Sequence, residues 1–304
     1  MSADHFTESY NGLSLVELIE QFGSEDRCHQ ALEELRWPAG VNCPRCESRS
    51  ISRIKKRRQF DCDGCRYQFS VRVGTVLQDS KLPLWKWFLA IYMMCESKKS
   101  VSANQLKRML GVSYKTAWFL CHRIRAAMVD EFPKALLGTV EMDETYIGGC
   151  TEGHANMFKD KTIVIGAVQR GGKARLRVAP DRKTKTLKKF AKEFISDNAK
   201  AIYTDASPSY TNAVGSPKTD HQTVTHRDSE WVHGKIHTNT VEGVFSLLDR
   251  SIMGAYHKVS KKHLPAYLHE VEWRFNNRKN DFLFRDTLMK LVRTEPVEYK
   301  ELTS

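Results

Sequence analysis

The chain has 304 residues, of which 41% are hydrophobic and 28% are charged, and its formal net charge is +12 with a sequence pI near 9.3. This length predicts two or three domains, and the composition predicts a soluble protein with buried cores. The positive charge favours a polyanionic partner, although ribosomal and membrane-surface proteins are equally basic.

The ends and apolar stretches of the chain predict its location. The first residues, MSADHFTESYNG, lack the basic and apolar regions of a signal peptide. The most apolar stretch, 82–95, contains Lys86 and is shorter than the ~20 residues that a spanning helix needs. We therefore expect a cytoplasmic, nucleoid-associated protein with no membrane partner. In a reducing compartment, its eight cysteines are not first interpreted as disulfides.

Residues 1–40 are expected to form an N-terminal helical region. Up to residue 36 they carry eight acidic residues and only two arginines. Four apolar residues recur there at helical spacing: Leu15, Leu18, Ile19 and Phe22. We expect this apolar face to pack on the cysteine-containing segment that follows, residues 41–78, or on another subunit. Three later stretches are strongly basic: 49–72, 98–125 and 170–192. They coincide with predicted binding elements, which strengthens the prediction of a polyanionic partner.

Residues 41–78 contain two CxxC pairs. Cys43-Pro-Arg-Cys46 and Cys62-Asp-Gly-Cys65 are fifteen residues apart. Each pair can present two thiolates to one metal from a tight turn, and two such turns complete a tetrahedral site. The spacing predicts a zinc ribbon with one structural Zn2+. Four thiolates leave no open coordination position, so we do not expect this zinc to be catalytic; it folds a segment too small for its own core.

The segment between the two cysteine pairs suits a short basic hairpin that contacts DNA phosphates. Its candidate DNA-binding residues are Arg53, Lys55, Lys56, Arg57 and Arg58. The other cysteines lack metal-binding spacing and are expected to be buried small hydrophobic side chains. These are Cys28, Cys95, Cys121 and Cys150.

Residues 80–130 are predicted to form three helices. The first covers about 82–96, and the others follow Ser102 and Ser113, because serine is a favoured N-cap. The turn between the second and third helices contains Gly111. A short glycine-containing turn between two helices is the arrangement of a helix-turn-helix.

The third of these helices would be the recognition helix of a DNA-binding segment. Its predicted polar face offers four candidate DNA contacts beside His122: Tyr114, Lys115, Arg123 and Arg125. The alternative is a plain three-helix bundle with a solvated basic face. No acidic residue occurs from 98 to 125, which favours DNA binding.

Residues 138–300 are predicted to form a third domain with a different pattern. Strands are expected at 139–143, 161–169, 174–179, 201–205 and 222–225, with helices near 187–195 and from residue 238. The element order strand-strand-strand-helix-strand-helix-strand-helix is that of a ribonuclease H-like mixed sheet. The whole chain is thus predicted to be a multidomain α+β or α/β protein, with a zinc ribbon, a helical segment and this catalytic domain.

Three acidic residues become neighbours in that fold. The first and fourth strands lie side by side, so Asp143 and Asp205, at their predicted ends, would face each other. Glu242, one turn into the late helix, completes the group. Such carboxylates are ligands for Mg2+. Two Mg2+ or Mn2+ ions ~3.5–4 Å apart would activate the attacking oxygen and stabilise the leaving oxygen in phosphodiester chemistry.

Each acid also has a plainer interpretation. Asp143 and Asp205 could be turn residues at strand ends, and Glu242 could occupy position N3 of a capping box behind an Asn239 cap. Their joint placement on the predicted elements favours the metal site. Three nearby acids, Glu141, Glu144 and Asp249, rank below the triad.

The chain resembles the zinc-ribbon insertion-sequence transposases with a DDE catalytic domain. The matching stretches, from about residue 26 to 278, include CPRC–CDGC, LGVSYKTAWFLCHRIRAAM, MDETYIGG, YTDAS and HTNTVEGVFSLLDRSIMGAYHKVSKKHLPAYLHEVEWRFNNR. The resemblance implies that Asp143, Asp205 and Glu242 are the catalytic acids. It also implies binding to terminal inverted repeats, 3′-end cleavage, strand transfer, and a homo-oligomer of at least two subunits on double-stranded DNA.

One departure from the family pattern lies beyond the third acid. The family often has a lysine seven residues after it, where this chain has Asp249 followed by Arg250. Arg250 is a candidate for the missing positive charge. His237 and Asn239 fall in the same matching stretch and are further candidate DNA contacts.

Two other functions stay open. One is a non-catalytic DNA-binding protein, such as a repressor or a domesticated transposase, against which the complete triad argues. The other is a ribonuclease H-like nuclease acting on RNA hybrids or junctions. The zinc ribbon and helix-turn-helix ahead of the catalytic domain favour double-stranded DNA instead.

Overall fold

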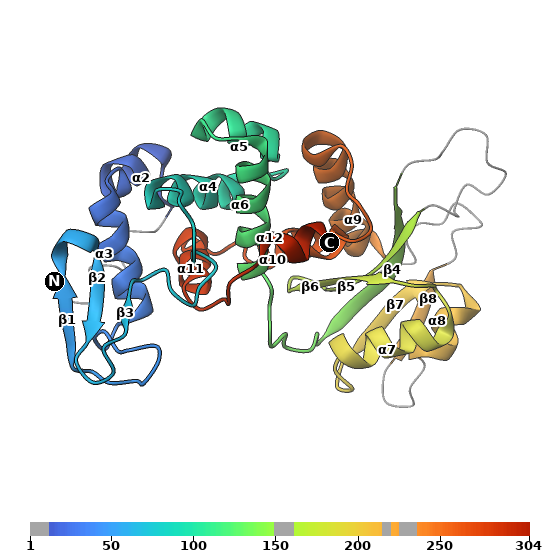
Figure 1. Ribbon diagram of the computed structural model, residues 1–304. Coiled ribbons are helices and arrows are strands. Elements are labelled where there is room, and N and C mark those ends of the chain that lie inside the picture. The colour runs from blue at the N-terminus through green and yellow to red at the C-terminus, as the bar shows by residue number, and fades with distance from the viewer. Residues whose placement is uncertain (1–11, 149–160, 215–219, 225–235) are drawn as a thin grey trace. The chain divides into compact units, whose positions relative to one another are not determined.

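The computed structural model describes residues 12–148, 161–214, 220–224 and 236–304, and the chain divides into two compact units (Figure 1). The first unit comprises residues 1–128 together with 279–304, and the second comprises residues 129–278. Residues 279–304, which the sequence prediction placed in the catalytic domain, thus group with the N-terminal unit. No helix in the described part of the chain is long and apolar enough to cross a membrane.

The first unit begins with helices α2 (Leu15–Phe22) and α3 (Glu25–Arg36). The Ser14 side chain caps α2 in a capping box with Glu17, which satisfies amides that the helix itself leaves unpaired. Leu18 and Phe22 are buried, whereas Leu15 and Ile19 are exposed. The Phe22 ring lies 5.1 Å from that of Phe88, so about half of the predicted apolar face packs within this unit.

The zinc-ribbon segment is a three-stranded antiparallel sheet of β1 (Ile51–Ile54), β2 (Gln59–Cys62) and β3 (Gln68–Phe69). A short 3-10 turn, η1 (Lys55–Arg57), joins the first two strands, so the predicted basic hairpin is present. The segment's small core packs the aromatic rings of Trp37, Phe60 and Phe69 beside the cysteines. A core of this size is small, and a metal cross-link would stabilise such a segment.

Three helices follow the ribbon: α4 (Leu84–Glu96), α5 (Ala103–Leu110) and α6 (Tyr114–Ala127). Ser102 and Ser113 cap α5 and α6 as predicted, and Gly111 ends α5 at φ 60°, where glycine is favoured. Helices α11 (Leu283–Leu291) and α12 (Tyr299–Thr303) complete the unit. Cys28, Cys95 and Cys121 are buried as expected; Cys150 lies outside the described residues.

The second unit is built on a five-stranded mixed sheet in the order β6-β5-β4-β7-β8, whose strands are labelled in Figure 1. Its strands are β4 (Thr139–Ile147), β5 (Thr162–Gln169), β6 (Ala174–Ala179), β7 (Ala201–Asp205) and β8 (Asp220–Val224). The first three strands pair antiparallel, whereas β7 runs parallel to both β4 and β8. This is the ribonuclease H-like arrangement, with the first and fourth strands adjacent as predicted.

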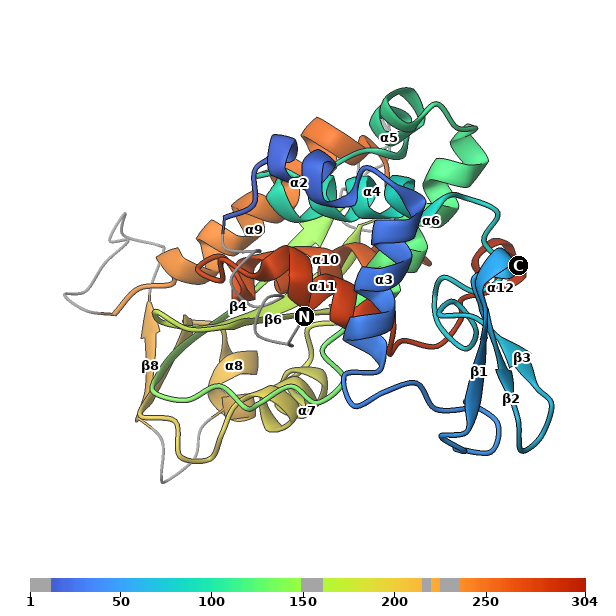
Figure 2. The same cartoon turned by 90° about the vertical axis from the view of Figure 1, so that its left-hand side faces the viewer.

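Helices cover both faces of this sheet (Figure 2). On one face, α7 (Thr184–Phe194) and α8 (Pro208–Val214) share a core with Val140 and Met142 of β4. On the other face lie α9 (Asn239–Ser251), the π-helical turn η3 (Ile252–Tyr256) and α10 (Leu264–Asn276). Because side chains alternate along a strand, Glu141 and Asp143 point to the α9 face.

Strand β4 continues beyond its predicted end at Asp143 to Ile147. Its antiparallel pairing with β5 extends through Ile147 and Thr162, which keeps the strand extended. Asp143 therefore lies within a paired strand rather than in a turn. The turn-residue interpretation of this acid was wrong.

Candidate active site and zinc site

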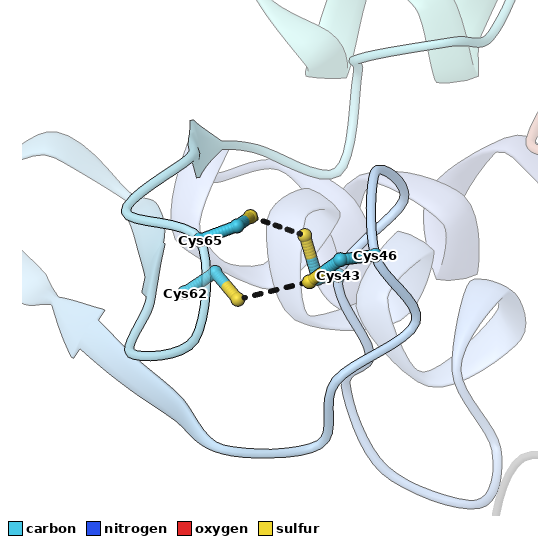
Figure 3. A group of neighbouring side chains, drawn as sticks. All are labelled: Cys43, Cys46, Cys62 and Cys65. Atoms are coloured by element: carbon cyan, nitrogen blue, oxygen red, sulfur yellow. Dashed lines mark hydrogen bonds between the residues drawn. The ribbon is translucent and has the colours of Figure 1, made fainter.

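The four cysteine side chains of the ribbon converge (Figure 3). Cys43 Sγ lies 3.7 Å from Cys65 Sγ, and Cys46 Sγ lies 3.5 Å from Cys62 Sγ. Within the described ranges, this is the only group of three or more His, Cys or acidic residues placed to hold a metal ion, and its four ligand atoms all lie within 4.8 Å of one another. A tetrahedral zinc with Zn–S bonds of about 2.3 Å requires S···S distances of about 3.8 Å. The observed spacing fits a structural Zn2+.

Backbone amides support thiolates at this site. The Arg45 N–H points to Cys43 Sγ at 3.4 Å. The N–H groups of Cys65 and Gly64 help lower the pKa of the Cys62 thiol to about 7. Since the thiolate is the form that ligates metal, these amides favour the ligating form of Cys62.

The candidate active site lies where β4 and β7 run side by side. Their parallel register pairs Glu141 with Tyr203. Two residues further along each strand, Asp143 and Asp205 come to the same level. Asp205 Oδ1 also accepts the Ser207 N–H at 3.0 Å, which fixes its carboxylate at the end of β7.

The three predicted acids lie on elements that contact one another: β4 pairs with β7, and α9 packs against β4. The pKa of Asp143 is raised from 3.8 to about 7, first by burial and then by the charges of Glu144, Asp205 and Glu242, while the Glu144 N–H, 2.8 Å from Asp143 Oδ1, opposes the rise. Such a partly buried group of negative charges favours binding of a cation. Among the described residues, the three carboxylates do not form a group as close as that of the ribbon thiolates.

Glu242 does not form the predicted capping box. Helix α9 has Thr238 as its N-cap, so Asn239 is the first helical residue and Val241, not Glu242, occupies N3. The Glu242 carboxylate instead accepts the Thr238 hydroxyl at 2.8 Å. The capping interpretation was wrong because the helix begins one residue earlier than a cap at Asn239 would require.

Two acids that ranked below the triad are buried beside it. The Glu144 side chain is 7% exposed and accepts the Tyr210 hydroxyl at 2.6 Å and Arg182 Nη1 at 3.2 Å. Glu141 is fully buried and contacts the start of α9. Sequence reasoning missed both roles. The available signal was the alternation in Val140-Glu-Met-Asp143, which places Glu141 on the same face as Asp143.

The basic hairpin is only partly free for DNA. Arg53 pairs with Glu33 of α3 and lies 4.8 Å over the Phe60 ring, and Arg58 Nε lies 2.6 Å from Asp26. Three basic side chains of the turn are exposed: Lys55, Lys56 and Arg57. The acidic α3 thus neutralises part of the hairpin charge.

The prediction that Arg123 and Arg125 lie on an exposed face of the recognition helix was wrong. They are 5% and 2% exposed, and Arg123 donates to the Gln78 carbonyl and lies 5.1 Å over the Trp87 ring. The C-terminal half of α6 packs all round, since α11 and α12 add contacts that local sequence does not predict. At the start of α6, Tyr114 and Lys115 are exposed.

The remaining candidate DNA contacts lie around α9. Nδ1 of His237 lies 3.3 Å from Glu141 Oε1, so this side chain belongs to a packed group. Asn239 and Arg250 are exposed. Seven residues on a helix turn by about 700°, so Asp249 lies on nearly the same side as Glu242, whereas Arg250 is rotated about 80° away. Arg250 therefore does not reproduce the position of the family lysine.

The sheet order, together with the acids on the adjacent strands β4 and β7, defines a ribonuclease H-like polynucleotidyl transferase fold. Residues 135–276 match the ISXO2-like transposase domain, and residues 23–68 match the transposase zinc-ribbon domain. The chain is 30% identical over 275 residues to "Uncharacterized protein in transposable element ISH50" of Halobacterium salinarum, covering 84% of this chain and 92% of that protein. The chain belongs to the ISXO2-like transposases of the IS1595 family and is a DDE transposase.

Solved structures give weaker likenesses. The catalytic core domain of HTLV-2 integrase, in complex with magnesium, is 14% identical with a TM-score of 0.28, covering 46% of this chain and 86% of that chain. A pre-cleavage Mos1 transpososome is 12% identical with a TM-score of 0.29, covering 68% of this chain and 76% of that chain. At these scores the likenesses add nothing to the sheet order described above.

Proposed function

We propose that this transposase binds the terminal inverted repeats of an insertion sequence and catalyses metal-dependent 3′-end cleavage and strand transfer into target DNA. The observation that carries the proposal is the placement of Asp143 and Asp205 on adjacent parallel strands, with Glu242 in a helix whose first turn is hydrogen-bonded to β4. Cleavage and joining are both displacements at a phosphodiester, so one site can serve both.

The three acids would hold two Mg2+ or Mn2+ ions, which supply activation of the attacking oxygen and stabilisation of the leaving oxygen. Asp143 and Asp205 are fixed by paired strands, and Glu242 by α9. Rigid elements hold carboxylates more accurately than loops do. Glu144 follows Asp143 in β4, and its own oxygens accept the Tyr210 hydroxyl and Arg182 Nη1.

A row of exposed basic residues on α7 supports DNA binding by the second unit. The row starts at Arg182, which contacts Glu144, the neighbour of Asp143 in β4. It continues along the exposed face of the helix with Lys185, Lys188, Lys189 and Lys192. Positive charge leading away from the acids suits a phosphate backbone whose scissile bond lies at the site. We assign target or flanking DNA to this face.

In the first unit, we assign the element ends to the start of α6 and the hairpin turn. Tyr114 and Lys115 occupy the first turn of the second helix of a helix-turn-helix, the part that meets base edges in such motifs. Lys55, Lys56 and Arg57 would contact phosphates. The structural Zn2+ holds this turn in place.

Joining two element ends requires at least two active sites, so we propose a homo-oligomer, at least a dimer, on nucleoid DNA. We expect no membrane partner. Light scattering of the protein with and without end-containing duplex tests it. A monomer bound to paired ends would contradict it.

The catalytic proposal is tested by incubating purified protein with end-containing duplex and Mg2+ or Mn2+. We expect nicks at the 3′ ends of the element and joined products, both lost in Asp143→Asn, Asp205→Asn and Glu242→Gln. Asp197→Asn, an exposed acid of the same unit, is the matched control and should remain active.

Two results would favour the other functions. Sequence-specific binding that ignores Mg2+ and leaves the strands intact indicates a non-catalytic repressor. Preferred cutting of an RNA–DNA hybrid over duplex DNA in direct competition indicates a ribonuclease H-like nuclease.

A further inference from the structure

Glu141 is a buried carboxylate that joins strand β4 to the start of helix α9. Its Oε2 accepts the N–H of Thr240 at 2.6 Å and that of Val241 at 3.1 Å. Its Oε1 accepts the Thr240 hydroxyl at 2.8 Å and Arg170 Nε at 2.6 Å. The side chain is 0% exposed. Every contact lies within the second unit.

These contacts replace an ordinary N-cap. The first amides of a helix have no partner within it, and the N-cap residue of α9, Thr238, makes no side-chain capping hydrogen bond. Glu141 supplies that partner from the sheet, 99 residues away in sequence from Thr240. Its negative charge also suits the positive end of the helix dipole. Helix α9 is thereby fastened at its first turn to the strand of the first catalytic acid.

The position of this contact bears directly on the active site. Glu141 and Asp143 share one face of β4, and Glu242 follows directly after Val241, whose amide Glu141 binds. The strand that carries the first acid thus fixes the turn that carries the third. With four donors on its two oxygens, Glu141 has no lone pair to offer a metal. It is not a fourth metal ligand.

Arg170 offsets the cost of burying the Glu141 carboxylate, and it links Glu141 to the segment that precedes α9. It pairs with Glu141, donates from Nη2 to the His237 carbonyl at 2.9 Å, and lies 4.8 Å over the Tyr203 ring. The chain entering α9 is therefore held by the same pair. Tyr203 precedes Asp205 by two residues, so all three acid-bearing elements meet at this pair.

We propose that Glu141 is a positioning residue of the transposase reaction: it sets the place of Glu242 relative to Asp143 by capping α9 from β4. The inference rests on the proposed metal-binding role of the triad. Loss of this contact should leave the DNA-binding surfaces intact. It should weaken metal binding and lower kcat, with little change in KM for DNA.

The test compares Glu141→Ala, Glu141→Gln and Thr240→Val with wild type in the full chain. Mn2+ affinity is measured from free Mn2+ by electron paramagnetic resonance, and cleavage is measured as kcat and KM. We expect Glu141→Ala to weaken Mn2+ binding and lower kcat by roughly 10–100-fold, the range seen when groups behind metal ligands are removed. Glu141→Gln keeps an acceptor oxygen and should be intermediate. Thr240→Val loses one of the four contacts and should change least.

Glu272→Ala is the matched control. This glutamate is also buried and paired, with Arg175 and Arg177, but caps nothing in α9. Its loss should lower thermal stability without changing Mn2+ affinity. The inference is overturned if folded Glu141→Ala binds Mn2+ within twofold of wild type, or if Glu272→Ala weakens binding equally. If Glu141→Ala does not fold, Glu141→Gln supplies the same comparison. Wild type that neither binds Mn2+ nor cleaves would refute the proposed function itself.

Discussion

Replacing Asp143 by asparagine should stabilise the metal-free protein while abolishing its activity. The carboxylate lies in a buried, negatively charged place that raises its pKa from 3.8 to about 7. Each tenfold change in an acid constant is worth about 1.4 kcal/mol, so ionised Asp143 costs on the order of 4 kcal/mol. Water and side-chain relaxation reduce this cost, and we expect a gain of about 1–3 kcal/mol in the free energy of unfolding.

The pH dependence of this gain has a definite sign. The folded-state pKa lies above the unfolded value, so Asp143 contributes most stability below about pH 4. That contribution is lost as the pH rises through about 7. Asp143→Asn lacks this titration. The stability difference between mutant and wild type should therefore grow between pH 4 and 7 and stay constant above pH 7.

The assay is urea unfolding of the full chain in chelator at pH 5 and pH 8, repeated with Mg2+. A tenfold excess of Mg2+ over its Kd should stabilise wild type by about 1.4 kcal/mol and the mutant by far less. Asp197→Asn, at an exposed position, should change neither result. If Asp143→Asn is less stable than wild type at pH 8 without metal, the reasoning from burial and charge fails.

Three other predictions address separate parts of the molecule. The protein should contain one Zn2+ per chain, and Cys62→Ser should lose this zinc and end binding but keep Mn2+ affinity, as measured by metal analysis and titration. Asp249→Lys should tighten end binding several-fold in a gel-shift assay, because it restores positive charge on the Glu242 side of α9; Asp249→Glu should not. Replacing both Lys188 and Lys189 by alanine should reduce the slope of log affinity against log salt by about 2. An unchanged slope would place the DNA elsewhere.

The sequence by itself determined the features that depend on near neighbours. The CxxC spacing, the serine caps of α5 and α6, and the strand and helix periods are all local, and each is present in the structure. The order of the elements then implied the β4–β7 pairing, because few sheet topologies accommodate that order. The neighbourhood of Asp143 and Asp205 followed from that pairing.

Only the tertiary structure decided which charged side chains are available. From the sequence, Glu141 ranked below the catalytic acids, yet its carboxylate caps a helix far along the chain. Arg123 looked like a DNA contact, yet it is buried under packing that involves distant segments. Local periodicity states which face of an element a side chain occupies. It does not state what covers that face, because the covering partner is set by contacts between residues far apart in sequence.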